Sequence, residues 1–140
     1  MEIEFAGAAR EVTGSCHILR VDGKTVLLDC GLFQGHRSDA EAKNRSLPCP
    51  IGQIDAVVLS HAHLDHSGRL PFLVSQGFSK PIHATKATAD LCAIMLADSA
   101  HIQESDFDFL SRHGREVEPP LYGVRDAARA EELMERHPYD

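Results

Sequence analysis

The sequence predicts an α/β fold in which these residues form one layer of a sandwich. Short apolar runs of strand length, rich in β-branched residues, crowd the first 85 positions. Longer segments with helical character fill most of the rest. An order of several strands followed by helices along the chain does not fit a closed all-β fold or an all-α fold. The 140 residues are enough for one ordinary domain with a buried core.

The predicted strands are short and are separated by clear turn signals. A loop between Gly7 and Gly14 divides the first two, and Asp22-Gly23 is a tight turn typical of a β-hairpin. The run "IDAVVLS" is continuous and apolar, as in a buried strand. The five predicted strands occupy residues 2–6, 15–21, 25–29, 54–60 and 80–85.

Four segments favour helix. The longest, 86–105, carries Leu91, Ile94, Met95 and Ile102 near one face. The last has acids early and Arg136 and His137 late, which suits the helix macrodipole. The region from Gly31 to Pro50 is otherwise polar and punctuated by glycine and proline, as in a loop. The predicted helices lie near 38–46 and at 67–78, 86–105 and 124–137.

The acidic excess lies in the second part of the chain. The sequence has 14 basic and 21 acidic residues, for a formal charge of −7. Residues 1–80 hold 8 basic and 9 acidic side chains (−1), and residues 81–140 hold 6 and 12 (−6). Because an acidic surface repels phosphate backbones, this composition argues against a general nucleic-acid binder. A polyanionic substrate would need a local positive centre, such as metal ions.

The cysteines and the amino terminus favour a cytoplasmic protein. No two of the four cysteines form a CxxC pair, so we expect four free, mostly buried thiols. The start "MEIEF" carries acids where a signal peptide needs bases, and no apolar run approaches membrane-spanning length.

The stretch "SHAHLDHSG" at residues 60–68 places four metal-ligand residue types within six positions. Imidazole and carboxylate are ordinary ligands of zinc and similar divalent ions. In an extended segment His61 and His63 point to the same side, so they can bind one ion together. A turn after Leu64 would direct Asp65 and His66 towards a second ion. A lone histidine is usually an ordinary side chain, but four ligand types in this spacing indicate a metal site.

The H-x-H-x-D-H spacing resembles the signature of the metallo-β-lactamase superfamily. Three stretches resemble its β-CASP branch of RNA-processing nucleases: "GAAREVTGSCH" at 7–17, "LLDCGLFQG" at 27–35 and "DAVVLSHAHLDHSGRLP" at 55–71. They follow the family order and together span residues 7–71, about half of the chain. The resemblance implies an α/β, metallo-β-lactamase-like αββα sandwich, of which residues 1–140 form the N-terminal half. The family's β-CASP cap domain is absent from this chain.

The resemblance also assigns roles to individual residues. His61 and His63 would bind one metal, and Asp65 and His66 the other. Asp65 would also be the catalytic residue that orients the attacking water. Asp29 would support the loop of residues 61–66, called the histidine loop below, through a hydrogen bond without binding metal itself.

Other polar residues are placed more loosely. Arg10 and Glu11 are candidates for lining the substrate cleft, and His17 is expected to be structural. The remaining histidines that fit no ligand motif are His83, His101, His113 and His137.

The leading interpretation is a metal-dependent ribonuclease with RNA as its partner and two divalent ions, zinc above all, as cofactors. Manganese or iron would suit the same ligands. One alternative is a small-molecule (thio)ester hydrolase of the same superfamily, which shares the cluster but does not need the first two motif stretches. Another is an inactive truncated or accessory chain. The sequence does not distinguish endonuclease from exonuclease. A sandwich cut at residue 140 would leave open sheet edges and an apolar face, so we expect either self-association, for example as a homo-oligomer, or poor solubility.

Overall fold

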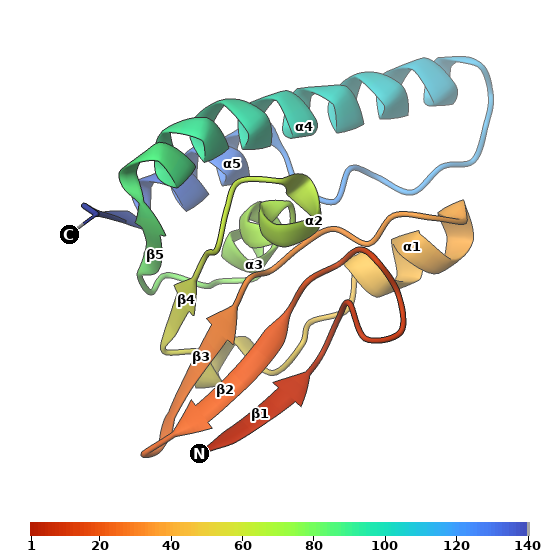
Figure 1. Cartoon of the computed structure of the whole chain (residues 1–140). Coiled ribbons are helices and arrows are strands. Elements are labelled where there is room, and N and C mark those ends of the chain that lie inside the picture. The colour runs from red at the N-terminus through yellow and green to blue at the C-terminus, as the bar shows by residue number, and fades with distance from the viewer. Residues whose placement is uncertain (140) are drawn as a thin grey trace.

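The computed structural model describes residues 1–139, apart from the side chain of Arg37. Six strands form one sheet in the order β1-β2-β3-β4-β5-β6 (Figure 1). The strands are β1 (Glu2–Phe5), β2 (His17–Val21), β3 (Lys24–Leu28), β4 (Ala56–Val58), β5 (Ile82–Thr85) and β6 (Met134–His137). The helices are α1 (Arg37–Asn44), α2 (Leu64–Ser67), α3 (Leu70–Ser75), α4 (Lys86–Arg112) and α5 (Val124–Glu132), with a 3₁₀ turn, η1 (Ile51–Gln53).

The sheet is antiparallel at its first three strands and parallel from β3 onwards. Asp22 and Gly23 join β2 to β3, and both have positive φ, 49° and 75°. A two-residue hairpin turn needs this backbone conformation, which confirms the predicted turn. The parallel part brings the carboxyl ends of β3 to β6 to one edge of the sheet, where sites collect in open α/β sheets.

One face of the sheet carries the core. Ile18, Leu27, Val57, Ile82 and Met134 are register neighbours across five strands, and all five are buried. They pack into one cluster with apolar side chains of α3, α4 and α5. These three helices lie close together beside β4 and β5 (Figure 1). Burial of apolar area on this side is the main stabilisation of the layer.

The opposite face of the sheet is open. Its side chains include Ile3, Phe5 and Val58, whose exposed fractions are 48%, 68% and 42%. A sheet with helices on one face and exposed apolar side chains on the other is one half of an αββα sandwich. The predicted α/β fold class is thereby confirmed.

Most predicted elements are confirmed with small shifts of their ends. All five predicted strands form, and the helix near 38–46 is α1. The helix predicted over 67–78 forms as the shorter α3, and the separate short helix α2, which covers Leu64–Ser67, was not predicted. The longest helix, α4, continues seven residues past its predicted end at 105, to Arg112. Thr85 caps its start by accepting a hydrogen bond from the backbone N–H of Thr88 at 3.3 Å.

Of the four apolar residues predicted to mark the packing face of α4, only Met95 packs against the core. Leu91, Ile94 and Ile102 are 49%, 69% and 50% exposed. The buried face consists mainly of small side chains, namely Thr88, Ala89, Cys92, Leu96, Ser99 and Ala100. Small residues let α4 approach α5 and the sheet closely, which leaves the larger side chains outside. Neither α4 nor any other described helix is long and apolar enough to cross a membrane.

The helix predicted over 124–137 is wrong beyond Glu132. The chain turns at Leu133, and Met134–His137 form the edge strand β6, parallel to β5. Pairing with β5 satisfies backbone groups that would otherwise be unpaired, and this tertiary gain outweighs the local preference for helix. Arg136 and His137 therefore lie on a strand and do not complement a helix dipole.

All four cysteines are free, as predicted, and Cys16, Cys30 and Cys92 are buried. The thiols of Cys16 and Cys30 are hydrogen-bonded to each other, and this bond together with burial raises the pKa of Cys16. Buried thiols of this kind pack as small hydrophobic groups.

Candidate metal centre

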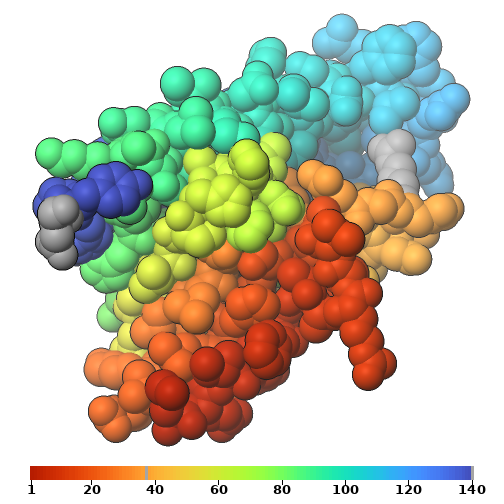
Figure 2. All heavy atoms as spheres, in the orientation of Figure 1, coloured from red at the N-terminus to blue at the C-terminus, as the bar shows by residue number. Residues whose placement is uncertain are grey.

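The four predicted ligands lie together on the loop that follows β4. His61 and His63 precede α2, and Asp65 and His66 stand in its first turn. The ring of His61 lies 4.0 Å from that of His66 and 4.7 Å from that of His63, centroid to centroid. Nε2 of His66 is 3.6 Å from Oδ2 of Asp65. In the space-filling view, the yellow-green atoms of this segment lie at the surface between α4 and the red N-terminal loop (Figure 2).

Backbone hydrogen bonds from two distant segments fix this loop. The carbonyl of Asp65 accepts from the N–H of Ser15, and the carbonyl of His66 accepts from the N–H of Cys30, both at 2.8 Å. Leu32 donates to the carbonyl of Leu64 at the same distance. The motif stretches at 7–17 and 27–35 therefore hold the histidine loop in place. This explains why three separated stretches occur together with the cluster.

Gly31 allows the closest of these approaches. A Cβ built on Gly31 would lie 1.7 Å from the carbonyl oxygen of Asp65, well inside van der Waals contact. Backbone cannot move aside as a flexible side chain can, so no other residue fits here without displacing the loop.

Asp29 organises the polar side of the cluster. Its Oδ2 lies 2.7 Å from Nδ1 of His66. The same carboxylate accepts hydrogen bonds from the backbone N–H and hydroxyl of Ser60, at 2.8 and 2.9 Å, and from the hydroxyl of Ser15 at 3.1 Å. Asp29 is buried and has a left-handed backbone, with φ of 62°. A carboxylate that accepts a hydrogen bond from Nδ1–H of a histidine favours the tautomer in which Nε2 carries the lone pair for a metal.

The imidazole and carboxylate donors of the histidine loop suit divalent ions, but they offer only two donors to each ion. Among the residues that the structure describes, the only three ligand atoms within 4.8 Å of one another belong to a different group, His83, Glu135 and His137. The cluster therefore brings at most two close donors to any one ion. Because catalytic zinc usually takes three protein ligands, further ligands would have to come from outside the cluster.

Arg69 supports the site from inside the fold. Its side chain is almost fully buried, and its guanidinium donates to the carbonyls of Gly31, Lys43 and Ser46 at 2.7 to 3.2 Å. It also lies over the ring of Phe33, 4.9 Å from the centroid. The sequence interpretation overlooked Arg69, as well as Ser15 and Ser60, although all three stand inside the motif stretches.

The structure does not bring the predicted cleft residues into the cluster. Glu11 forms an ion pair with Lys43 of α1 at 2.7 Å and lines a hollow of about 300 Å³ beside Arg69. Arg10 is exposed, with φ of 63°. His17 lies on β2 with its ring edge against Phe5, and its buried Nδ1 has no hydrogen-bond partner among the described residues. The cleft role of Arg10 and Glu11 stays a prediction.

A comparison with known proteins defines the family. The model of the metallo-beta-lactamase superfamily matches residues 9–139, so the chain belongs to this superfamily. Its curated relatives are of the β-CASP branch, which confirms the resemblance read from the three motif stretches.

Two curated relatives and one solved structure illustrate the similarity. Ribonuclease TTHA0252 of Thermus thermophilus is 49% identical over 111 residues, which is 76% of this chain and 24% of that protein. Integrator complex subunit 11 of Gallus gallus is 37% identical over 97 residues, 66% of this chain and 16% of that protein. A metallo-β-lactamase with a HARLDQ motif from Cronobacter sakazakii is 23% identical, with a TM-score of 0.48, over 65% of this chain and 31% of that one. The chain spans a quarter or less of the length of these curated relatives.

Proposed function

We propose that residues 1–140 are the N-terminal part of a metal-dependent ribonuclease of the β-CASP type. The observation that carries the proposal is the joint placement of four metal-ligand side chains with a buried carboxylate behind one of them. The similarity to a protein named as a ribonuclease, 49% identical over 111 residues, supports RNA as the substrate class.

His61 and His63 would hold one divalent ion, and Asp65 and His66 a second. Zinc suits these nitrogen and oxygen donors best. When bound, such ions act as Lewis acids that polarise the phosphodiester and favour deprotonation of water. Asp29 would accept a hydrogen bond from Nδ1–H of His66 and so direct its Nε2 towards the ion, and Asp65 would orient the attacking water through its carboxylate.

Charge explains why ions would be needed here. The chain has a formal charge of −7, so its surface repels RNA at long range. Divalent ions between His61 and Asp65 would supply the local positive charge that draws a phosphate to the point of cleavage. The missing third ligands would come from residues outside 1–140. The family's cap domain would also lie outside this chain.

The proposal is tested by an RNA-cleavage assay. It measures turnover of a labelled RNA by the longest natural protein that contains this sequence. We expect Asp65→Ala to reduce cleavage by at least about a hundredfold, the scale of a lost positioned acid–base group. Asp108→Ala removes an exposed carboxylate on α4 and should leave cleavage unchanged. A thioester substrate assayed in parallel separates the rival hydrolase: if Asp65 supports thioester turnover and the protein cleaves no RNA, the ribonuclease assignment is wrong.

A further inference from the structure

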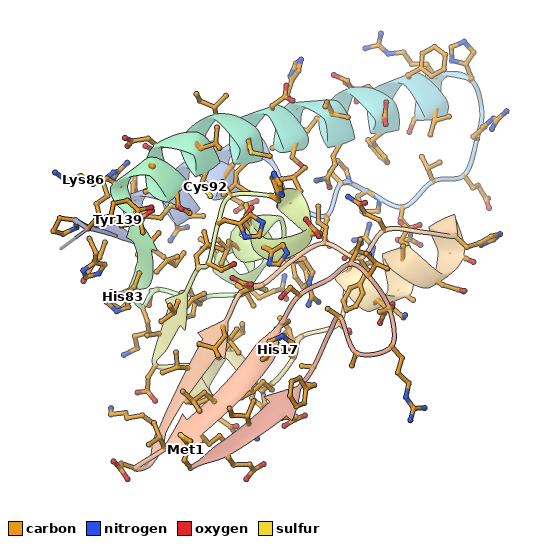
Figure 3. All side chains as sticks on the ribbon, viewed as in Figure 1. Met1, His17, His83, Lys86, Cys92 and Tyr139 are labelled. Atoms are coloured by element: carbon orange, nitrogen blue, oxygen red, sulfur yellow. The ribbon has the colours of Figure 1, made fainter. Side chains whose placement is uncertain are left out.

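A second group of metal-ligand side chains stands on the open face of the sheet, away from the histidine loop. His83 lies on β5, and Glu135 and His137 lie on β6. Nδ1 of His83 is 3.0 Å from Nε2 of His137 and 3.4 Å from Oε2 of Glu135. All three ligand atoms lie within 4.8 Å of one another. Figure 3 shows His83 beside β5, at the same end of the molecule as Tyr139.

The strand register explains why these residues meet. His83 is the direct register partner of Glu135, and Thr85 is that of His137. Side chains two residues apart on a strand share a face, so Glu135 and His137 point to the same side. Arg136 points to the other side, where it pairs with Asp90 and Glu131. The backbone pairing alone therefore places two imidazoles and one carboxylate on one surface.

We propose that His83, Glu135 and His137 form a second binding site for a divalent transition-metal ion, zinc above all. Two ligands of a tetrahedral zinc lie about 3.3–3.4 Å apart, given Zn–N bonds of about 2.0–2.1 Å. The two shorter distances in the group, 3.0 and 3.4 Å, bracket this value. Two histidines and one glutamate are a known zinc ligand set, with a fourth position left for water.

The site has a definite physical consequence for the fold. β6 is the edge strand of the sheet and pairs only with β5 among the described strands. An ion bound by one residue of β5 and two of β6 would tie the edge strand to its neighbour. Because binding to the folded state alone stabilises it by mass action, zinc should raise the unfolding temperature. The proposal does not depend on the proposed ribonuclease function.

The test uses the 140-residue chain with His61→Ala, His63→Ala, Asp65→Ala and His66→Ala, so that any zinc signal comes from elsewhere than the histidine loop. We expect this parent to bind one equivalent of zinc by isothermal titration. With cobalt(II) as probe, it should show the visible absorption of a tetrahedral ion. Adding His83→Ala or His137→Ala removes a ligand and should weaken zinc binding by more than tenfold. Loss of a residue that only supports a ligand through a hydrogen bond already weakens metal binding about tenfold. His101→Ala removes an exposed histidine of α4 and is the matched control.

Glu135→Gln provides a variant that keeps the side-chain shape and removes the charge. It should bind zinc more weakly while its metal-free unfolding temperature stays that of the parent, because Glu135 is exposed. The proposal is overturned if the parent binds no zinc, or if His83→Ala, His137→Ala and Glu135→Gln all bind zinc as the parent and the His101→Ala control do.

Discussion

Oδ2 of Asp29 lies 2.7 Å from Nδ1 of His66, and the two residues are 37 positions apart in the chain. The contact joins the end of β3 to the start of α2. Ser60 and Ser15, which donate hydrogen bonds to the same carboxylate, come from two further segments. One buried carboxylate thus fixes the orientation of a candidate ligand and the path of the loop that carries it.

Asp29→Asn separates the electrostatic role of this carboxylate from its structural role. Asparagine tolerates the left-handed backbone at φ of 62°, so we expect the unfolding temperature to change little. Metal affinity at the histidine loop should fall about 10- to 100-fold, because an amide no longer accepts from His66 as a carboxylate does. Zinc titration in the His83→Ala background measures this loss alone. Unchanged affinity would refute the role assigned to Asp29.

Gly31→Ala should strongly destabilise the fold. Its Cβ would overlap the carbonyl oxygen of Asp65, and overpacking of this kind costs about 1–3 kcal/mol or more. Gly52→Ala is the matched control, since a Cβ there meets nothing within 4 Å. Urea unfolding of both variants measures the free energy of unfolding. Equal stability of the two would show that the loop is not held as tightly as the structure indicates.

The strands and the site could be read from the sequence because both are local. A continuous apolar run marks β4, and the four ligand types of the histidine loop lie within six positions. The end of α5 could not be read this way, because Met134–His137 become a strand only through pairing with β5. The packing face of α4 could not be read from the sequence for a similar reason: most of its buried side chains are small, whereas Leu91, Ile94 and Ile102 face outwards.

The group of His83, Glu135 and His137 illustrates the same limit. His83 lies 52 positions before Glu135, and no local spacing links them. The alternation of Glu135 and His137 was the available signal, but it was masked by the prediction of a helix there. Once β6 is known to be a strand in register with β5, the group follows from the pairing.

The thiol of Cys92 provides a prediction about pH. Burial raises its pKa in the folded state to about 11, above the ordinary value of 9.0. As pH rises past about 9, the unfolded chain therefore loses this proton first, and the free energy of unfolding falls until about pH 11. Below pH 9 this group has no effect. Urea unfolding of wild type and Cys92→Ala across this range should show a shallower decline in the variant; parallel declines would contradict the assignment.

The 140-residue chain on its own should not cleave RNA. The histidine loop brings at most two close donors to an ion, and catalytic zinc usually needs three. If the proposed function holds, the residues that position the RNA would also lie outside 1–140, and positioning lowers much of the barrier. A labelled RNA incubated with the purified chain and zinc at pH 7 checks this. Robust cleavage that His63→Ala abolishes would instead indicate a site completed by a second copy of the chain.

Zinc titration of the histidine loop tests the central claim most directly. In a His83→Ala, His137→Ala background, the 140-residue chain should bind zinc through His61, His63, Asp65 and His66. Adding His61→Ala and His63→Ala should abolish one binding event, and adding Asp65→Ala should weaken the other, with the circular-dichroism spectrum unchanged. The account predicts this stepwise loss. Zinc binding that stays the same after all three substitutions, or no zinc binding in the background chain, would contradict it.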